Sequence, residues 1–275
     1  MAETTLVVPA APGPLHLSLD PRSPVQAAML CDLVTIDGYE PGTWATFKAL
    51  LRPGDFYIDV GAHIGVFTCL GALIVGPTGR VLAFEPDNDN RRRLQQNVAR
   101  NGFAHVAIDK RAVANVTDRL SFYRCADNDG GHALYNPGRA AANVKTRAHP
   151  KQSIVRTTTL DDAVLPGSPP VRLLKIDVEG AEVNVLRGAQ RILGTDRPAI
   201  IAEINAFGLQ QMGEGEHTLR AFLRSFGYQE YGIQDVAPHR VPLTPEQTIQ
   251  QQEYNDGVLY MTVFNMLFLH PESGR

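Results

Sequence analysis

Three apolar runs of strand length each end in a short polar string, and this feature constrains the fold more than any other. The strings are Asp59-Val-Gly-Ala-His-Ile-Gly65, Phe84-Glu-Pro86 and Lys175-Ile-Asp-Val-Glu-Gly-Ala-Glu182. In an open parallel sheet, the groups that bind a ligand lie at the carboxyl ends of the strands. The strings therefore predict a parallel sheet with one functional edge to which all three contribute.

From Phe56 onward, apolar runs, loops and amphipathic segments alternate along the chain. This alternation is typical of a parallel sheet with covering helices. We expect strands at 56–60, 80–85, 105–108, 171–177, 198–204, 228–233 and 264–270, and helices at 64–74, 88–100, 181–193 and 217–226. No clear helix separates the last two strands, which favours an antiparallel last strand. The predicted fold class is α/β with a mostly parallel sheet.

The 275 residues suffice for one α/β core with a modest appendage. Prolines are dense in residues 1–45, which we interpret as an N-terminal cap or leader, and residues 46–275 as the main domain. The stretches 125–153 and 234–262 break the alternation. Long loops in compact domains are usually functional, so we expect both to be substrate loops.

Composition excludes several classes of function. The chain has 26 Lys plus Arg against 29 Asp plus Glu, a net charge of -3, which argues against a nucleic-acid partner. Cys31, Cys69 and Cys125 form no Cys-x-x-Cys pair, so a zinc or redox site is not expected. The start of the chain lacks the charge pattern of a signal peptide, and no run of 18 apolar residues occurs. We expect a cytoplasmic protein without a membrane partner.

The first two strings predict a site for a nucleoside cofactor. Gly61 and Gly65 stand where the chain turns from a strand into a helix, and glycine permits tight turns beside a ligand. Glu85 ends the next strand, 26 residues after Asp59, where a carboxylate can accept both hydroxyl protons of a ribose. A nicotinamide cofactor is one candidate, but the glycine spacing is wider than Gly-x-Gly-x-x-Gly and the acidic strand end repels phosphate. S-adenosylmethionine, which has an ammonium group and no phosphate, fits better.

In these three motifs, the chain resembles the FkbM family of S-adenosylmethionine-dependent methyltransferases. The resemblance covers residues 39–204 and also includes Leu51-Arg-Pro-Gly-Asp55, Gly79-Arg-Val-Leu-Ala-Phe-Glu-Pro86 and Thr158-Thr-Leu-Asp-Asp162. It implies a Rossmann-like class I methyltransferase fold with a seven-stranded sheet and an antiparallel last strand. It also implies a transferase that methylates a hydroxyl of a small molecule, such as a sugar or an intermediate of natural product biosynthesis.

The resemblance further implies positions for the cofactor. Gly61 and Gly65, with Ala62 and His63 between them, would border its methionine part. Asp59 would lie near the amino group, Glu85 would hold the ribose, Ala112 would flank the adenine, and Asp177 would lie near the methyl group.

Methyl transfer needs an aligned acceptor oxygen and a group that removes its proton. Asp177 ends the fourth strand of the main run, and strand alternation puts Lys175 on the same side, where the two can form an ion pair. His132 lies in the loop expected to cover the site and is a candidate base. Glu179 is a further catalytic candidate, although it can equally favour the positive end of the helix that follows.

Four alternatives stay open at this point. Asp177, Glu203 and Asn205 offer three oxygen ligands for a magnesium-assisted O-methyltransferase, although we expect no metal. An NAD-dependent oxidoreductase, a nucleic-acid methyltransferase and a non-catalytic cofactor-binding partner are the others. The sequence leaves open the identity of the acceptor and whether the chain forms a homo-oligomer.

Overall fold

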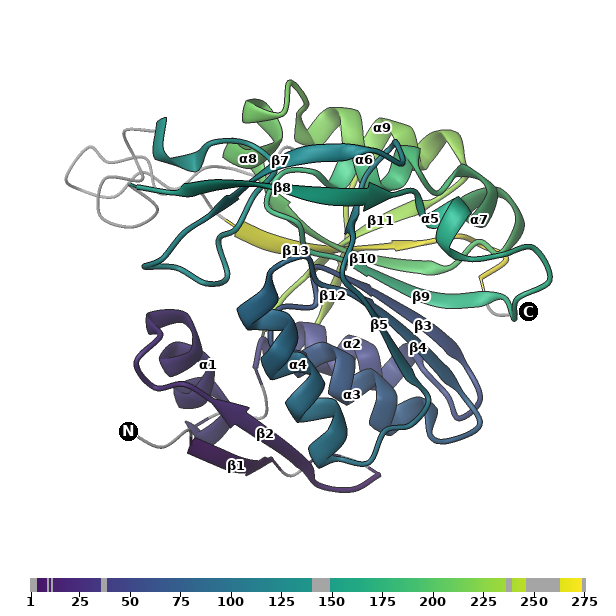
Figure 1. Cartoon of the computed structure of the whole chain (residues 1–275). Coiled ribbons are helices and arrows are strands. Elements are labelled where there is room, and N and C mark those ends of the chain that lie inside the picture. Colours follow the sequence, from purple (N-terminus) through teal and green to yellow (C-terminus); the bar gives the residue numbers. More distant parts are fainter. Residues whose placement is uncertain are drawn as a thin grey trace.

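The computed structural model of the chain describes residues 4–8, 10, 12–35, 39–139, 149–235, 239–245 and 263–273. A central sheet runs through the molecule with helices on both of its faces (Figure 1). In the described residues its strand order is β12-β11-β13-β10-β9-β3-β4-β5. The strands are β3 (Phe56–Val60), β4 (Arg80–Phe84), β5 (Val106–Asp109), β9 (Val171–Ile176), β10 (Ala199–Asn205), β11 (Gln229–Ile233), β12 (Arg240–Pro242) and β13 (Val263–Leu269).

All seven strands expected from the sequence are present. The pairs from β10 across to β5 are parallel, and β13 runs antiparallel to both β10 and β11. The expected strand count was wrong by one, because β12 adds an eighth strand to the described sheet, antiparallel to β11. Arg240-Val-Pro242 is too short to give a strand signal, and it lies in the predicted loop 234–262, most of which is outside the described residues.

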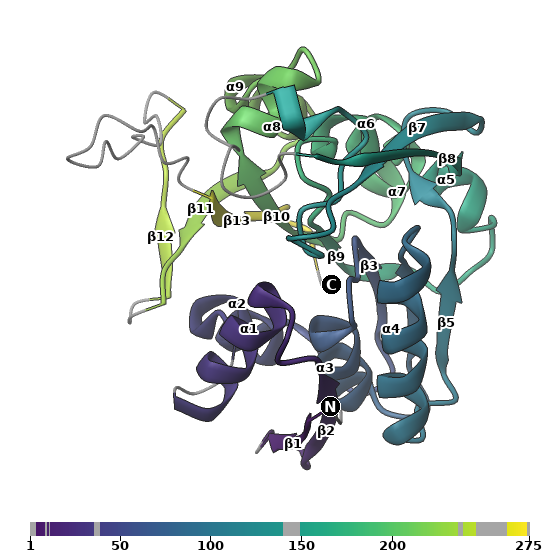
Figure 2. The same cartoon turned by 60° about the vertical axis from the view of Figure 1, so that its left-hand side comes forward.

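Two groups of helices cover the sheet (Figures 1 and 2). One face carries α1 (Pro24–Thr35), α2 (Pro41–Leu50), α3 (Val66–Val75) and α4 (Asn88–Arg100). The other carries α5 (Leu160–Ala163), α6 (Glu182–Arg187), α7 (Gln190–Thr195), α8 (Ala206–Gln211) and α9 (Glu216–Ser225). No helix in the described part of the chain is long and apolar enough to cross a membrane.

The single helix expected at 181–193 is instead two short helices, α6 and α7. The break falls at Gly188, where a Cβ would lie 2.3 Å from the carbonyl oxygen of Ala114. Asp161 then accepts hydrogen bonds from the main-chain N–H groups of Arg191 and Ile192 at 2.8 and 3.2 Å. These bonds satisfy donors of a new helix start, so the break depends on residues distant in the sequence.

Both faces of the sheet are buried, because side chains alternate along each strand. On β3, Tyr57 packs with α2 and α3 on one face, whereas Phe56 and Ile58 belong to the apolar cluster on the other. The two clusters continue through the remaining strands, which explains why the strands are continuous apolar runs.

The N-terminal segment packs against the same core. β1 (Thr4–Val8) and β2 (Leu15–Leu19) form a hairpin beside α4, where Ser18 N donates to Asn97 Oδ1 at 2.7 Å. The 12 residues of α1 were not expected from a segment so rich in proline. A smaller sheet of β6 (Ala112–Val113), β8 (Lys151–Thr158) and β7 (Arg119–Arg124) lies on the side of α5 to α9, with a short 3-10 turn at Pro137–Arg139.

Candidate active site

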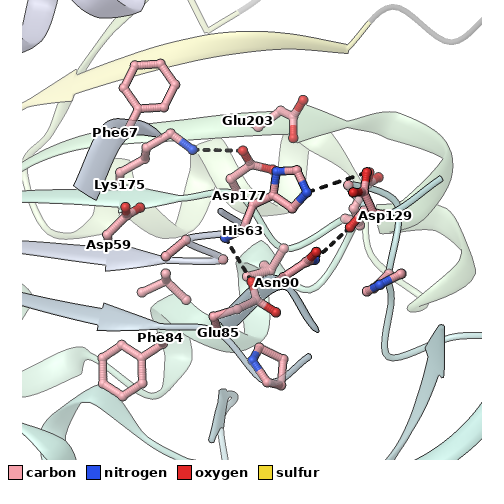
Figure 3. Close-up of a pocket in the computed structure, with 18 of the residues that line it drawn as sticks. Asp59, His63, Phe67, Phe84, Glu85, Asn90, Asp129, Lys175, Asp177 and Glu203 are labelled. Atoms are coloured by element: carbon pink, nitrogen blue, oxygen red, sulfur yellow. Dashed lines mark hydrogen bonds and ion pairs between the residues drawn. The ribbon is translucent and has the colours of Figure 1, made fainter. Parts of the chain in front are cut away.

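A cavity of about 270 Å³ opens at the carboxyl ends of β3, β4, β9 and β10. Nearly all residues predicted for the site line it together, and Figure 3 shows how several of them converge. Those lining it are Asp59, Gly61, Ala62, His63, Glu85, Ala112, His132, Lys175, Asp177 and Glu179. Gly65 does not line the cavity and is the N-cap of α3.

The turn after β3 requires glycine for two different reasons. Gly61 has φ of +83°, and a Cβ there would lie 1.8 Å from the carbonyl oxygen of Asp177. A Cβ on Gly65 would lie 2.3 Å from Leu94 Cδ1 on α4. Gly61 therefore lets the turn approach the end of β9, while Gly65 lets α3 approach α4 and shapes the cavity only indirectly.

Glu85 is held rigidly at the end of β4. Its Oε2 accepts from His63 N at 2.8 Å and its Oε1 from Asp87 N at 2.7 Å. The residue is 5 % exposed, and burial raises its pKa to about 8, which these two bonds offset only in part. The carboxyl group is thus oriented by main-chain donors and its charge depends on what enters the cavity.

Lys175 and Asp177 form the ion pair expected from strand alternation. Lys175 Nζ lies 2.8 Å from Asp177 Oδ2 and 5.0 Å from the centre of the Phe67 ring. Asp59, the register partner of Lys175 on β3, accepts a hydrogen bond from Thr68 at 2.5 Å. Burial lowers the pKa of Lys175, but the carboxylates of Asp177, Asp59 and Glu40 outweigh it and raise that pKa above its usual value.

Several cavity residues were not predicted as site residues from the sequence, among them three with titratable side chains. Tyr39 and Glu40 come from the N-terminal segment, and Glu203, which the sequence offered as a metal ligand, lies on β10. Glu40 accepts a hydrogen bond from Asn265 on β13 at 2.7 Å, and burial raises its pKa. No sequence pattern indicates that Glu40, 19 positions before Asp59, lines the same cavity as Asp59.

Backbone strain is concentrated at the cavity. Among the described residues, four that are not glycine have a positive φ: Glu40, His63, Glu179 and Arg197. The first three line the cavity. Such conformations are costly and tend to persist where side-chain placement matters for function, which makes this cavity the candidate functional site.

The segment 125–139 covers one side of the cavity, whereas residues 140–148 of the predicted loop lie outside the described residues. Asp129 accepts hydrogen bonds from Ser23 Oγ at 2.8 Å and Gln26 Nε2 at 2.5 Å, and its Oδ1 lies 3.6 Å from His63 Nε2. Burial raises the pKa of Asp129, but these partners outweigh it and hold the pKa at about 2. The segment is therefore fastened to α1.

His132 belongs to this segment and lines the cavity. Its Nδ1 accepts from Cys125 N at 3.1 Å, and its Nε2 lies 3.8 Å from Asp87 Oδ2. Burial lowers the pKa of His132 more than Asp87 raises it, so the ring is neutral at neutral pH.

The magnesium alternative is not supported by the arrangement of its ligands. Asn205 Oδ1 accepts from Gly208 N at 2.9 Å, and Asn205 Nδ2 donates to Glu179 at 2.6 Å. The side chain of Asn205 is therefore committed to α8 and to Glu179. In the described ranges, no three His, Cys, Asp or Glu side chains are grouped to hold a metal ion.

The fold and the site together define a class of protein. The sheet order and the antiparallel last strand are those of a Rossmann-like methyltransferase, and Glu85, which follows β4, suits the S-adenosylmethionine-dependent class. The family model of the methyltransferase FkbM domain matches residues 59–230. The chain belongs to this family, as its sequence motifs predicted, and its cofactor is S-adenosylmethionine. A nicotinamide-dependent oxidoreductase is thereby set aside.

Curated relatives are similar over part of their length. The 31-O-demethyl-FK506 methyltransferase FkbM of Streptomyces tacrolimicus is 30 % identical over 209 residues, which cover 67 % of this chain and 76 % of the relative. The hexuronic acid methyltransferase AglP of Haloferax volcanii is 29 % identical over 154 residues, 55 % of this chain and 56 % of the relative. With AglP, the chain thus matches little more than half of the relative's length.

Two solved methyltransferase structures are similar to this chain at low sequence identity and with TM-scores below 0.5. The FkbM methyltransferase of Methylobacillus flagellatus superposes with a TM-score of 0.46 and 17 % identity, over 89 % of this chain and 53 % of that chain. The O-methyltransferase TomG of Streptomyces achromogenes gives a TM-score of 0.42 and 14 % identity, over 83 % and 79 %.

Proposed function

We propose that this protein transfers a methyl group from S-adenosylmethionine to a hydroxyl of a small molecule, such as a sugar or a natural product. The observation that supports this most is one cavity that joins a ribose-type carboxylate, Glu85, to the acidic ends of β9 and β10. The names of the relatives, which act on a hexuronic acid and on a demethylated FK506, agree with a small oxygen-bearing acceptor.

The residues present fit the cofactor by their chemistry. Glu85 would accept the ribose hydroxyls, and the apolar walls at Phe84, Ala112 and Val113 suit an adenine ring. Asp59 is 1 % exposed, and burial raises its pKa although Lys175, Thr68 and Tyr57 favour the ionised form. A cationic ammonium group of a ligand would therefore stabilise its charge.

The backbone around Gly61, Ala62 and His63 would border the methionine part, and Gly65 would contribute through the shape of the turn. When bound, S-adenosylmethionine supplies a methyl group on a positively charged sulfur. Alignment of the acceptor then contributes up to about 7–11 kcal/mol to lowering the barrier. Of the predicted catalytic residues, Lys175 would keep Asp177 ionised, while Glu179 and His132 would position the acceptor from the cavity rim.

The surrounding segments complete the proposal. Val25, Met29, Tyr39 and Glu40 line the cavity, so residues 1–45 would act as a cap over the site of their own chain. The segments 125–153 and 234–262 would select the acceptor. All of the charged residues lining the cavity other than Lys175 and the histidines are acidic, which favours an acceptor whose buried part is neutral.

Calorimetry and a transfer assay test the proposal together. We expect S-adenosylhomocysteine to bind and NAD not to bind. Radiolabelled methyl groups should pass from S-adenosylmethionine to at least one member of a panel of hexuronic acid glycosides and hydroxylated macrolides. Absence of S-adenosylhomocysteine binding at millimolar concentration would refute the cofactor, and binding without transfer to any hydroxyl compound would contradict O-methylation.

Replacing Glu85 by Ala provides a residue-level check. Loss of a charged hydrogen-bond acceptor costs about 1.5–3 kcal/mol, so the Kd for S-adenosylhomocysteine should rise at least about tenfold. Glu214→Ala is a suitable control, because Glu214 pairs with Arg187 outside the cavity. An equal Kd for wild type and Glu85→Ala would remove Glu85 from the cofactor site.

A further inference from the structure

Asp177 and Glu203 stand side by side at the carboxyl end of the sheet. β9 and β10 are parallel, and Ile176 pairs with Ala202 in their register, so the two acids occupy the next position on each chain. Neighbouring strands lie about 4.8 Å apart, which brings the carboxyl groups within reach of each other. The two carboxyl groups influence each other's ionisation, and both line the cavity (Figure 3).

The surroundings of the two acids differ. Lys175 Nζ contacts Asp177 at 2.8 Å; burial raises the pKa of Asp177, but Lys175 and Glu203 outweigh it and lower that pKa. Burial and the charge of Asp177 raise the pKa of Glu203. The titratable groups that interact with the pair are Tyr39 and Glu40 before α2, Tyr57 and Asp59 on β3, His63 after β3, Lys175 on β9, Glu179 after β9 and Glu182 in α6. The two acids therefore titrate as a pair, in which ionisation of Asp177 and protonation of Glu203 are favoured.

The other acid and base groups of the cavity are oriented by hydrogen bonds to different partners. Glu179 Oε2 accepts from Asn205, Glu85 accepts from two main-chain N–H groups, and His132 Nδ1 accepts from Cys125 N. Asp177 and Glu203 instead lie side by side at the carboxyl edge of the sheet, where Lys175 donates to Asp177, and a proton can be taken up without breaking a cap or a turn.

We propose that the Asp177–Glu203 pair takes the proton from the acceptor hydroxyl, and that the pair first loses its own proton to solvent when the positively charged methyl donor binds. This inference rests on the proposed function. In the transfer, the acceptor oxygen forms a bond to the methyl carbon, the carbon–sulfur bond breaks with its electron pair remaining on sulfur, and the hydroxyl proton passes to the pair. A positive charge within about 4–6 Å lowers a carboxyl pKa by roughly 1–3 units, which is enough to couple donor binding to proton release.

Proton release on binding tests the pair without any acceptor. Calorimetric titration at several pH values between 6 and 9, in two buffers of different ionisation enthalpy, gives the number of protons released. S-adenosylmethionine and S-adenosylhomocysteine differ in the methyl group and its charge but share the ribose, so Glu85 contributes equally to both. We expect the wild type to release more protons with S-adenosylmethionine, with a difference approaching one.

Glu203→Gln and Asp177→Asn should each abolish this difference, and Glu203→Gln should keep the Kd for S-adenosylhomocysteine within about threefold. Glu182→Gln is the matched control: Glu182 is buried with a pKa raised to about 8, yet it lies outside the cavity lining, so the difference should persist. For any acceptor found in the panel, Glu203→Gln should lower kcat by about 10²–10⁴.

The outcomes separate the two proposals. If both ligands bind but release equal numbers of protons at every pH, or if the difference persists in Glu203→Gln, the pair is not the proton acceptor while the proposed function stands. If neither ligand binds, the proposed function fails and the inference with it.

Discussion

Glu85 is a buried carboxyl group whose ionisation would change when a ligand occupies the cavity. Two main-chain N–H groups fix its orientation, yet burial raises its pKa to about 8. Near neutral pH the cofactor-free group is therefore largely protonated. A ribose diol offers two hydroxyl donors, which favour the ionised carboxylate as acceptor. Cofactor binding and ionisation of Glu85 should thus be linked.

The pH dependence of binding follows from this linkage. Because the ionised form binds the ribose better and the pKa is raised, affinity should increase as the pH rises from 6 to 8, by up to about tenfold per unit, and level off above 8. Calorimetry with S-adenosylhomocysteine measures this directly. Glu85→Gln should bind more weakly and lose the slope, and Glu182→Gln should retain it. The same slope in Glu85→Gln as in wild type would show that another group is responsible.

A pair of glycines gives a second test at the residue scale. Ala at position 61 would need φ of +83° and a Cβ 1.8 Å from Asp177 O, so Gly61→Ala should lose about 3 kcal/mol or more of unfolding free energy. Gly194 lies in α7 with nothing within 4 Å of a Cβ, so Gly194→Ala should gain about 0.5–1 kcal/mol. Urea denaturation compares the two. Equal small effects would contradict the close approach of the turn to β9.

At the scale of elements, the strands of the main sheet were predictable because each is a continuous apolar run buried on both faces. β8 was missed because Lys151-Gln-Ser-Ile-Val-Arg156 is mostly exposed and polar. The break between α6 and α7 was missed because its cause, Asp161, lies about 30 residues earlier. Asp59, Glu85, Lys175 and Asp177 were predictable as site residues because strand ends place them locally. Glu40 was not, because tertiary packing alone brings it to the cavity.

The cap on α7 can be tested by substitution. Asp161→Ala removes the acceptor for two main-chain N–H groups, and loss of a helix cap costs about 0.5–2 kcal/mol. We expect a lower midpoint in urea with an unchanged slope. Asp162→Ala is the control on the same short helix, since Asp162 is exposed and accepts from Thr117 and not from α7, and surface substitutions stay within about 0.5 kcal/mol. Similar losses for both variants would argue against the capping role of Asp161.

At the scale of the whole molecule, the cavity is closed by two segments about 100 residues apart in the sequence, α1 and the segment 125–139, which face each other in Figure 1. Asp129 joins them through Ser23 and Gln26, and its main-chain oxygen accepts from Asn90 of α4 at 2.8 Å. The apolar clusters that form the core do not include Asp129, Ser23 or Gln26. Closure of the cavity is therefore separable from folding.

Asp129→Ala should open the cavity while the fold survives. Loss of charged hydrogen bonds, each worth about 1.5–3 kcal/mol, should speed hydrogen exchange in residues 23–30 and 125–135 and raise the release rate of S-adenosylhomocysteine about tenfold or more. Exchange in β3 and β9 should stay slow, because global stability is governed by the core.

Asp89→Ala is the control: Asp89 pairs with Arg92 and Arg124 nearby, but has no bond to α1 among the contacts of the described residues. Faster exchange with an unchanged release rate would mean that α1 packs beside the cavity without retaining what it holds. Faster release would show that residues distant in sequence jointly act as a cap.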